Sequence, residues 1–345
     1  IVKFRRPENL CGQCRPLDLR GDGVPAAKQL PKVGEFRVLH ISQPLDVLNQ
    51  VSLLFGNLFQ QFYSMVDTMI VGRVLGTGPL AAVGSTGSIT FLIIGFCLGL
   101  CSGFAIPVAQ RMGAGDYSQM RRYVANAAWL CIAASVVLTI STVALTRPMM
   151  QLMQTPDDII DGAVIYIGWI FAGIPFIFLY NMVAAIMRAL GDSKTPLYAM
   201  VIASILNIGL DLLFVMVFHW GIAGAVVATV IAQLFAALYC LRAVLHVKVI
   251  HLKKEYFRLN PEIAKRLLGL GTPVAAQNVI IAVGGMVVQS VVNRYGTLFV
   301  AGFTATNKLY GILEIAAVSF GYAVTTYVGQ NLGAGLLDRV KKGMH

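Results

Sequence analysis

Charged side chains are scarce in this sequence. Only 12% of the 345 residues are Asp, Glu, Lys or Arg, whereas 57% are hydrophobic, and the mean hydropathy is +0.72. A soluble domain of ordinary composition carries about 25% charged residues. Half that share leaves too little charge to cover a water-exposed surface. The composition therefore excludes a soluble globular protein and predicts an all-α integral membrane protein surrounded by the lipid bilayer.

Groups that could perform catalysis or hold a transition metal are also few. Cys11 and Cys14 form a C-x-x-C pair, but no second pair or nearby histidine completes a zinc site. An intramembrane enzyme would need a Ser/His, His-rich or paired-Asp arrangement, and we predict no catalytic residue, no enzyme activity and no cofactor. The five histidines all fall in predicted tails or loops, at His40, His219, His246, His251 and His345.

Long apolar runs recur along the chain. They approach or pass the ~20 residues that a helix needs to cross a bilayer, and turn-forming Gly, Asn and Pro residues separate them. The runs predict about eight membrane-spanning helices, centred on residues 47–72, 88–110, 125–145, 163–190, 197–218, 222–245, 267–292 and 298–330.

Basic residues are distributed unevenly between the two sides of these predicted spans. If the N-terminus is cytoplasmic, the outside loops keep only Arg73, Arg147 and Arg294, and the other Lys and Arg residues lie inside, except Lys308 within the last predicted span. This asymmetry follows the positive-inside rule and predicts a cytoplasmic N-terminus. We expect a multi-pass protein of the plasma (inner) membrane. Because the net charge of +11 lies between apolar runs, it does not indicate a nucleic-acid partner. Arg188 and Lys194, near Asp192, are interpreted as inside anchors and as partners within their loop.

The sequence contains an internal repeat with an offset of 220 residues. Residues 110–115 (Q-R-M-G-A-G) match residues 330–335 (Q-N-L-G-A-G), and no gap is needed back to residue 71. Both copies follow an even number of spans, so the repeat is parallel, as in some transporter folds. We predict a polar tail at 1–44, a six-helix lobe at 45–246 and a linker at 247–266. Residues 267–345 then start a second lobe that holds two helices, as if the chain were truncated.

Two carboxylates lie deep in predicted spans near two other oxygen-bearing side chains. Asp67 and Asp211 are isolated among apolar residues, where a charge costs about 2.5–3.5 kcal/mol on insertion scales. Asn207 precedes Asp211 by one helical turn, and Thr229 falls at a similar depth, roughly 8–12 Å below the outer surface. Such a cluster suits a hard cation or a shared proton. Glu314 is a further candidate, for a proton or substrate site in the second lobe.

Several motifs in order resemble the multidrug and toxic compound extrusion (MATE) family of efflux transporters, from about Leu48 to the end. They are residues 66–73 (V-D-T-M-I-V-G-R), 110–115, 188–196 (R-A-L-G-D-S-K-T-P), 207–211 (N-I-G-L-D) and 221–229 (G-I-A-G-A-V-V-A-T). The resemblance implies twelve helices in two lobes. It also implies a cation site at positions matching Asp67, Asn207, Asp211 and Thr229.

The predicted function is secondary active multidrug efflux. The resemblance implies a monomer that exports drug-like organic cations in exchange for Na⁺ or H⁺ by alternating access. One alternative is a flippase for lipid-linked oligosaccharides, although its cavity would be expected to hold several basic residues. An ion channel is the alternative from another class. Aromatic residues such as Phe59, Tyr63 and Tyr180 are interpreted as packing, since aromatic rings dominate buried area.

Overall fold

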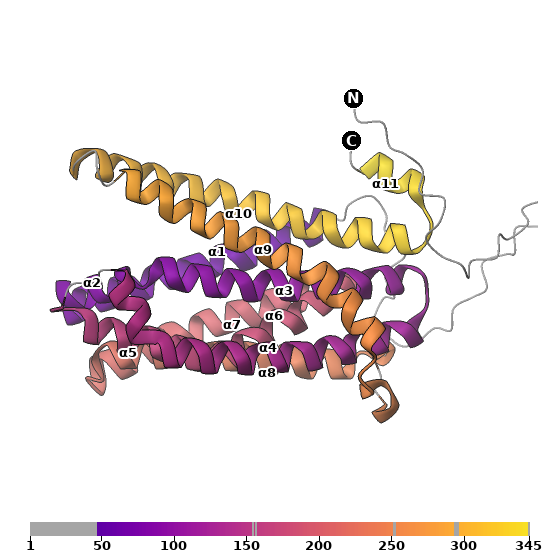
Figure 1. Ribbon diagram of the computed structural model, residues 1–345, viewed down its shortest axis with the longest axis horizontal. Helices are drawn as coiled ribbons and strands as arrows, with labels where there is room; N and C mark the ends of the chain where they lie inside the picture. The colour runs from indigo at the N-terminus through magenta and orange to yellow at the C-terminus, as the bar shows by residue number, and fades with distance from the viewer. Residues whose placement is uncertain (1–46, 154, 156, 251–252, 293–296, 344–345) are drawn as a thin grey trace, which may run out of the picture. The chain divides into compact units, whose positions relative to one another are not determined.

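Helices form at every apolar run that the sequence predicts. The computed structural model describes residues 47–153, 155, 157–250, 253–292 and 297–343, and the predicted tail and the Cys11–Cys14 pair lie outside them. No strand occurs in these described ranges. The elements (Figure 1) are α1 (Val47–Ile70), η1 (Val71–Leu75), α2 (Thr77–Ser85), α3 (Gly87–Gly113), α4 (Tyr117–Leu152), α5 (Ile160–Ala172), α6 (Ile174–Ala189), α7 (Lys194–Asp211), η2 (Leu212–Val217), α8 (Gly221–His246), η3 (Lys248–Ile250), η4 (Lys254–Phe257), α9 (Pro261–Val292), α10 (Thr297–Gly333) and α11 (Leu337–Gly343).

The helices have the length and apolar surface of membrane spans. Within the described residues, five segments are long and apolar enough to cross a bilayer, and the α5–α6 pair makes a sixth if its two parts form one span. Helices α1 and α10 are not among these, although the sequence predicts both as spans. Val137, Ile140 and Ile205 are 63%, 65% and 68% exposed, which suits contact with lipid. The prediction of an all-helical integral membrane protein is confirmed.

One predicted span is broken in the structure. Residues 163–190 form α5 and α6, which meet at Gly173 with a bend of 44°. Pro175 lies in the first turn of α6, where its missing N–H costs no hydrogen bond. Pro175 therefore marks the start of a new helix rather than a bend within a continuous one. Similarly, His246 ends α8 rather than lying in a loop.

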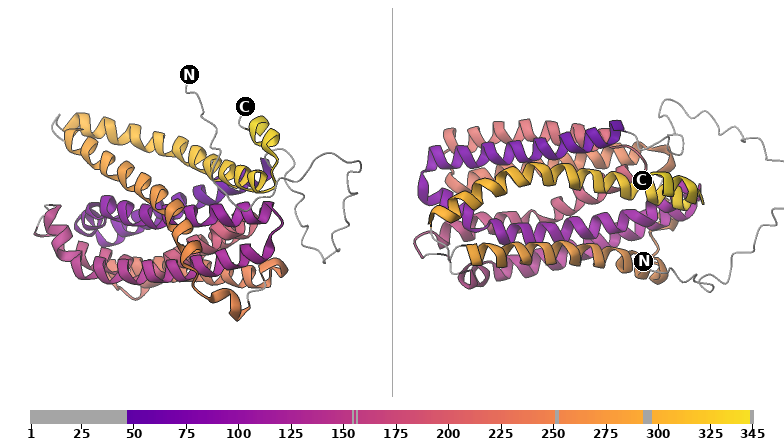
Figure 2. Two further views of the ribbon diagram at one scale, coloured as in Figure 1. Left: turned by 45° about the vertical axis from the view of Figure 1, so that its right-hand side comes forward. Right: turned by 90° about the horizontal axis from the view of Figure 1, so that it is seen from above.

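Small residues allow α3 to pack closely against α9. A side chain at Gly99 would collide with the backbone at Ala275, and one at Gly103 with the backbone of Gly271. Such small residues four positions apart let membrane helices approach each other. Asn278 Nδ2 also donates to the Gly95 carbonyl at 2.8 Å. In Figure 1 and on the left of Figure 2, the orange α9 crosses the purple α3, and α3 also contacts α10, α4 and α6.

The two copies of the repeat make the same turn. Gly115 and Gly335 have φ of 70° and 73°, which favours glycine because it lacks Cβ. The Ala114 N–H donates to Gln110 at 3.0 Å, and the Ala334 N–H donates to Gln330 at the same distance. The copies therefore share local geometry, while the division of the chain into lobes remains a prediction.

The two turns also touch each other reciprocally. A Cβ at Gly113 would collide with the backbone of Gln330, and a Cβ at Gly333 would collide with the backbone of Gln110. The Gln330 side chain donates to the Ala189 carbonyl at 2.9 Å, which ties this contact to α6. We name the contact between residues 110–113 and 330–333 the glycine seam.

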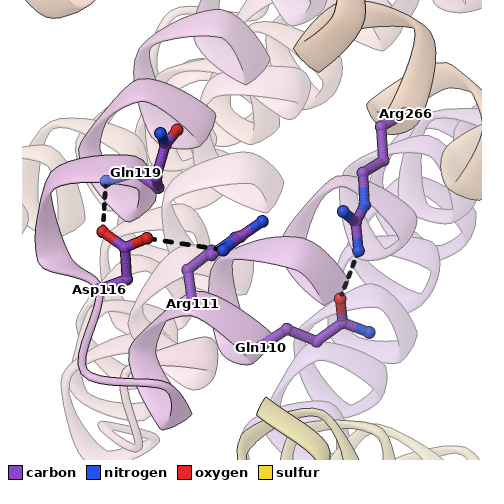
Figure 3. A network of polar contacts seen from close by, with 5 residues as sticks. All are labelled: Gln110, Arg111, Asp116, Gln119 and Arg266. Carbon is purple, nitrogen blue, oxygen red and sulfur yellow. Dashed lines mark hydrogen bonds and ion pairs between the residues drawn. The ribbon is translucent and has the colours of Figure 1, made fainter. Parts of the chain in front are cut away.

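Polar side chains fix the chain around the first turn (Figure 3). Asp116 begins α4 by accepting from the Gln119 N–H at 3.1 Å, and its other oxygen pairs with Arg111 at 3.5 Å. Arg266 of α9 donates to Gln110 Oε1 at 3.3 Å. An N-cap carboxylate satisfies N–H groups that the helix itself leaves unpaired. The network therefore holds the end of α3, the start of α4 and α9 together.

The predicted linker is docked rather than extended. Arg121 of α4 donates to the Val249 carbonyl at 2.8 Å, and Trp129 donates to the Phe257 carbonyl at 3.0 Å. Asn126 accepts from the Asn260 N–H at 2.8 Å. Helix α9 already begins at Pro261, inside the range assigned to the linker. Val249, Phe257 and Asn260 of this segment therefore lie against α4.

Candidate ion-binding site

The first helix brings Asp67 into the bundle just before a change in helical geometry. Asp67 is 7% exposed and lies on the last turn of α1. The chain continues directly into η1, a π-helical segment. A π-helical turn is rare and occurs often at functional sites. The apolar run over residues 47–72 gives no sign of this segment.

Helix α7 repeats the same arrangement. Asn207 and Asp211 are fully buried on one face, and Asp211 is the last residue before the π-helical segment η2. The two π-helical segments contact each other. Val71 of η1 and Val215 of η2 form a small buried cluster with Ala225 of α8. This cluster holds the ends of α1 and α7 next to the start of α8.

A tight aromatic turn directs α8 back along α7. His219 and Gly221 both have positive φ, of 54° and 62°. Phe214 stacks on Trp220 with ring centroids 4.9 Å apart. The reversal places Thr229 of α8 opposite Asn207, whose Nδ2 donates to Thr229 Oγ1 at 3.3 Å.

The structure brings the four predicted residues together. Asp67 and Asp211 lie close enough to interact electrostatically, α1 contacts α7, and Asn207 bonds to Thr229. Glu314 is different: it is exposed on α10, and no described residue forms a hydrogen bond or ion pair with it. Lys308 precedes Glu314 by six residues on the same helix, and its side chain lies outside the described residues.

Most oxygens of this cluster lack a donor. Asp67 Oδ1, Asn207 Oδ1 and both carboxylate oxygens of Asp211 are buried and accept no hydrogen bond from a described residue. A buried acceptor without a partner costs about 1–3 kcal/mol. Such a set of converging oxygens fits a hard cation or a proton as its partner. In the described part of the chain, no group of three His, Cys, Asp or Glu residues could hold a metal ion.

Three side chains near the carboxylates, those of Tyr63, Tyr166 and Gln233, were not assigned to the site from the sequence. Tyr63 precedes Asp67 by one turn, and its hydroxyl accepts from Gln233 Nε2 at 3.4 Å. Tyr63 and Tyr166 both interact electrostatically with Asp67 and Asp211. The interpretation of Tyr63 as packing alone is therefore incomplete. Gln233 follows Thr229 by four residues, and this helical spacing could have revealed it.

Buried oxygens that converge from three helices of an apolar bundle define a multi-pass membrane protein with an intramembrane polar site. The MatE family model matches residues 53–213 and 273–344. Together these ranges make up more than half of the chain. The chain belongs to the MATE family of transporters, which confirms the resemblance. The matched ranges include Asp67, Asn207, Asp211 and Glu314 but not Thr229.

Curated relatives agree with this family. The probable multidrug resistance protein YpnP of Bacillus subtilis is 34% identical over 294 residues, which are 85% of this chain and 66% of that protein. YoeA of Bacillus subtilis, another probable multidrug resistance protein, is 32% identical over 85% of this chain and 65% of its own length. The FAD transporter of Shewanella oneidensis is 26% identical over 88% of this chain and 69% of its length. The chain thus spans about two thirds of these relatives.

Solved structures share the fold. A MOP superfamily transporter from Pyrococcus furiosus has a TM-score of 0.82 at 24% identity, covering 88% of this chain and 68% of that one. A MATE family transporter in an outward-facing conformation has a TM-score of 0.80 at 23% identity, covering 88% of this chain and 70% of that one. At such identities the likeness concerns the arrangement of helices alone.

Proposed function

We propose that this chain belongs to a secondary active transporter that moves small organic compounds out across the plasma membrane in exchange for Na⁺ or H⁺. The observation that carries the proposal is the cluster of buried acceptors without donors at Asp67, Asn207 and Asp211. A cation or proton at these oxygens offsets the cost of burying them. If its affinity differs between two conformations, its binding shifts the population between them, and this difference couples ion movement to alternating access.

Other findings support the parts of this proposal unequally. The multidrug names of two relatives support drug-like compounds, whereas the Shewanella relative is named for FAD. A flippase would be expected to hold several basic residues in its cavity, and only Arg188 does so among the described residues that line one. A channel would pass ions at high rates without exchange, and ion flux in vesicles separates it from an exchanger.

Transport in vesicles tests the proposal. The chain in proteoliposomes is given a Na⁺ gradient or a pH gradient, with ethidium or phenylphosphate as the transported compound. We expect one gradient to drive transport, and Asp211→Asn to lose this dependence. Asp161→Asn is the matched control, because this carboxylate is exposed and, among the described residues, pairs with Arg147 alone, at 3.3 Å. Transport that neither gradient changes, or full coupling in both Asp67→Asn and Asp211→Asn, would contradict the proposal.

A further inference from the structure

A second polar region lies away from the carboxylates, in a cavity of about 300 Å³ between α3, α6, α9 and α10. Helices α3 and α9 form one part of its wall where their small residues let them cross closely. Helix α6 contributes its last turn, and α10 closes the opposite part. The polar side chains that line it are Ser102, Arg188, Gln277, Asn278, Tyr322, Thr325 and Thr326. A volume of this size is at the lower end for ligand sites.

The charge of this cavity is opposite to that of the ion-binding site. Arg188 is the one charged side chain among the described residues that line it, and no carboxylate does so. Asp192 follows Arg188 by four residues but is used elsewhere. Its Oδ1 accepts from the Lys194 and Thr195 N–H groups at 3.0 and 3.1 Å, and its Oδ2 accepts from the Thr195 hydroxyl. The interpretation of Arg188 as a partner of Asp192 within the loop is therefore wrong.

The guanidinium of Arg188 is held in place without being neutralised. It lies over the ring of Tyr322, 5.3 Å from the ring centre, and the aromatic face attracts it without using its N–H donors. No carboxylate of a described residue forms an ion pair with it. An inside anchor would point its charge to water, whereas Arg188 is partly buried and lines the cavity. Its donors are therefore available to a ligand.

Neutral donors accompany this arginine. Ser102, Gln277, Tyr322 and Thr326 line the cavity, and none of them has a hydrogen-bond partner among the described residues. In contrast, Asn278 donates to Gly95 and Thr325 donates to Gly321, so these two are already used. A guanidinium surrounded by hydroxyl and amide donors, without a competing carboxylate, matches carboxylate and phosphate oxygens.

We propose that this cavity binds the carboxylate or phosphate group of an organic anion, with Arg188 as its principal contact. Binding of the anion does not depend on the proposed transport function. That this anion is also the transported compound does rest on it. The anion replaces the organic cations that the family resemblance implies, because the described lining offers a cation no negative charge. A phospholipid headgroup carries the same phosphate chemistry, so the test must separate a soluble anion from a lipid.

Equilibrium binding of two matched probes tests the inference without any ion gradient. The chain is placed in phosphatidylcholine vesicles with radiolabelled phenylphosphate or benzylammonium, which have the same ring and opposite charges. We expect phenylphosphate to bind at least about tenfold more tightly than benzylammonium, and Arg188→Gln to weaken it about tenfold or more, since charge-assisted hydrogen bonds are lost. Arg188→Lys keeps the charge but not the bidentate geometry, so its affinity for phenylphosphate should lie between those of wild type and Arg188→Gln.

Controls keep the result interpretable. Arg242→Gln removes another arginine near an inner helix end, outside the cavity, and should leave binding unchanged. Gly321→Leu should exclude both probes, because Gly321 lines the cavity and a Cβ there meets open space rather than backbone. Equal binding by wild type and Arg188→Gln, or tighter binding of benzylammonium, would overturn the inference.

A lipid arm distinguishes the two sources of phosphate. The measurement is repeated in vesicles that contain phosphatidylglycerol. Unchanged phenylphosphate binding supports a soluble anion, whereas its displacement would assign the cavity to a lipid headgroup and overturn the soluble substrate. Failure here leaves the proposed ion coupling intact, because that proposal depends on gradients and on Asp211. Conversely, if transport depends on neither gradient but phenylphosphate still binds, the proposed ion coupling is contradicted and the anion-binding inference stands.

Discussion

The candidate ion-binding site and the arginine cavity are built from different helices and carry opposite charge. The first joins two carboxylates, an amide and a hydroxyl from α1, α7 and α8. The second surrounds one guanidinium with neutral donors from α3, α6, α9 and α10. Acceptors without donors define the first region, and donors without acceptors define the second. Each region therefore suits a ligand that the other would repel.

The difference also shows how the two regions could influence each other. Helix α1 carries Asp67, and ten residues earlier its Asn57 donates to Ser319 of α10 at 2.9 Å. Ser319 follows Val318, which lines the arginine cavity. One helix thus reaches both regions. A change in α1 on ion binding would reach the cavity wall through this contact.

Inverting the charge of the cavity should have the largest effect on which ligand the cavity binds. We expect Arg188→Glu to make both regions acidic and to change the binding ratio of phenylphosphate to benzylammonium by about a hundredfold or more, because attraction becomes repulsion. Competition binding of the two probes measures the ratio. Arg242→Glu, the same change outside the cavity, should leave the ratio as it is in wild type. A ratio unchanged in Arg188→Glu would show that the guanidinium does not face the ligand.

Removing the amide of the candidate ion-binding site should have a smaller effect, on the affinity of that site for its ion. Asn207→Ala deletes an oxygen without a donor and the bond to Thr229, and we expect ion affinity to fall about tenfold without being lost, since both carboxylates remain. Calorimetric titration with Na⁺, or proton uptake, measures this. Asn181→Ala is the control, because that amide donates only to the Ile177 carbonyl of its own helix. An unchanged affinity in Asn207→Ala would remove the amide from the site.

Backbone packing should also distinguish the two regions. A Cβ at Gly113, in the glycine seam beside the cavity, meets the backbone of Gln330, whereas a Cβ at Gly209 in α7 meets open space. We expect Gly113→Ala to destabilise the fold by about 1–3 kcal/mol through overpacking. Gly209→Ala should be neutral or slightly stabilising, because alanine favours helix. The midpoints of thermal unfolding in detergent check this pair, and equal midpoints would contradict the close contact of the seam.

The sequence could predict the fold and that four polar residues of α1, α7 and α8 lie near one another, while their role in binding an ion stays a prediction. Apolar runs decide where spans form, and the spacing of Asn207 and Asp211 places both on one face whatever the packing. The signals for two more features were present but unused. Gly95, Gly99 and Gly103 repeat every four residues on α3, and Gln233 follows Thr229 by one turn.

Other features depend on packing that no local pattern records. The π-helical segments after Asp67 and Asp211 arise where α1, α7 and α8 pack around Val71, Val215 and Ala225. Arg188 contributes to the predicted positive-inside asymmetry, and this signal is the same whether the side chain points to water or into a cavity. Its partner Tyr322 lies 134 positions along the chain, so only the tertiary structure shows the contact.

Breaking the contact between α1 and α10 should change the two ligand affinities least. It tests whether the two regions are coupled. Asn57→Ala removes the bond to Ser319 but touches neither proposed ligand, so each affinity measured alone should stay within about a factor of two. The effect of Na⁺ or low pH on phenylphosphate binding should weaken about threefold, since coupling between sites depends on an element that both sites bias. The measurement is phenylphosphate binding with and without saturating ion in wild type, Asn57→Ala, Ser319→Ala and the double variant. If the contact transmits the effect, the double variant should be no weaker than either single variant, because residues that act through one bond are not additive. Full coupling in all three variants would mean that the regions communicate by another route or act independently.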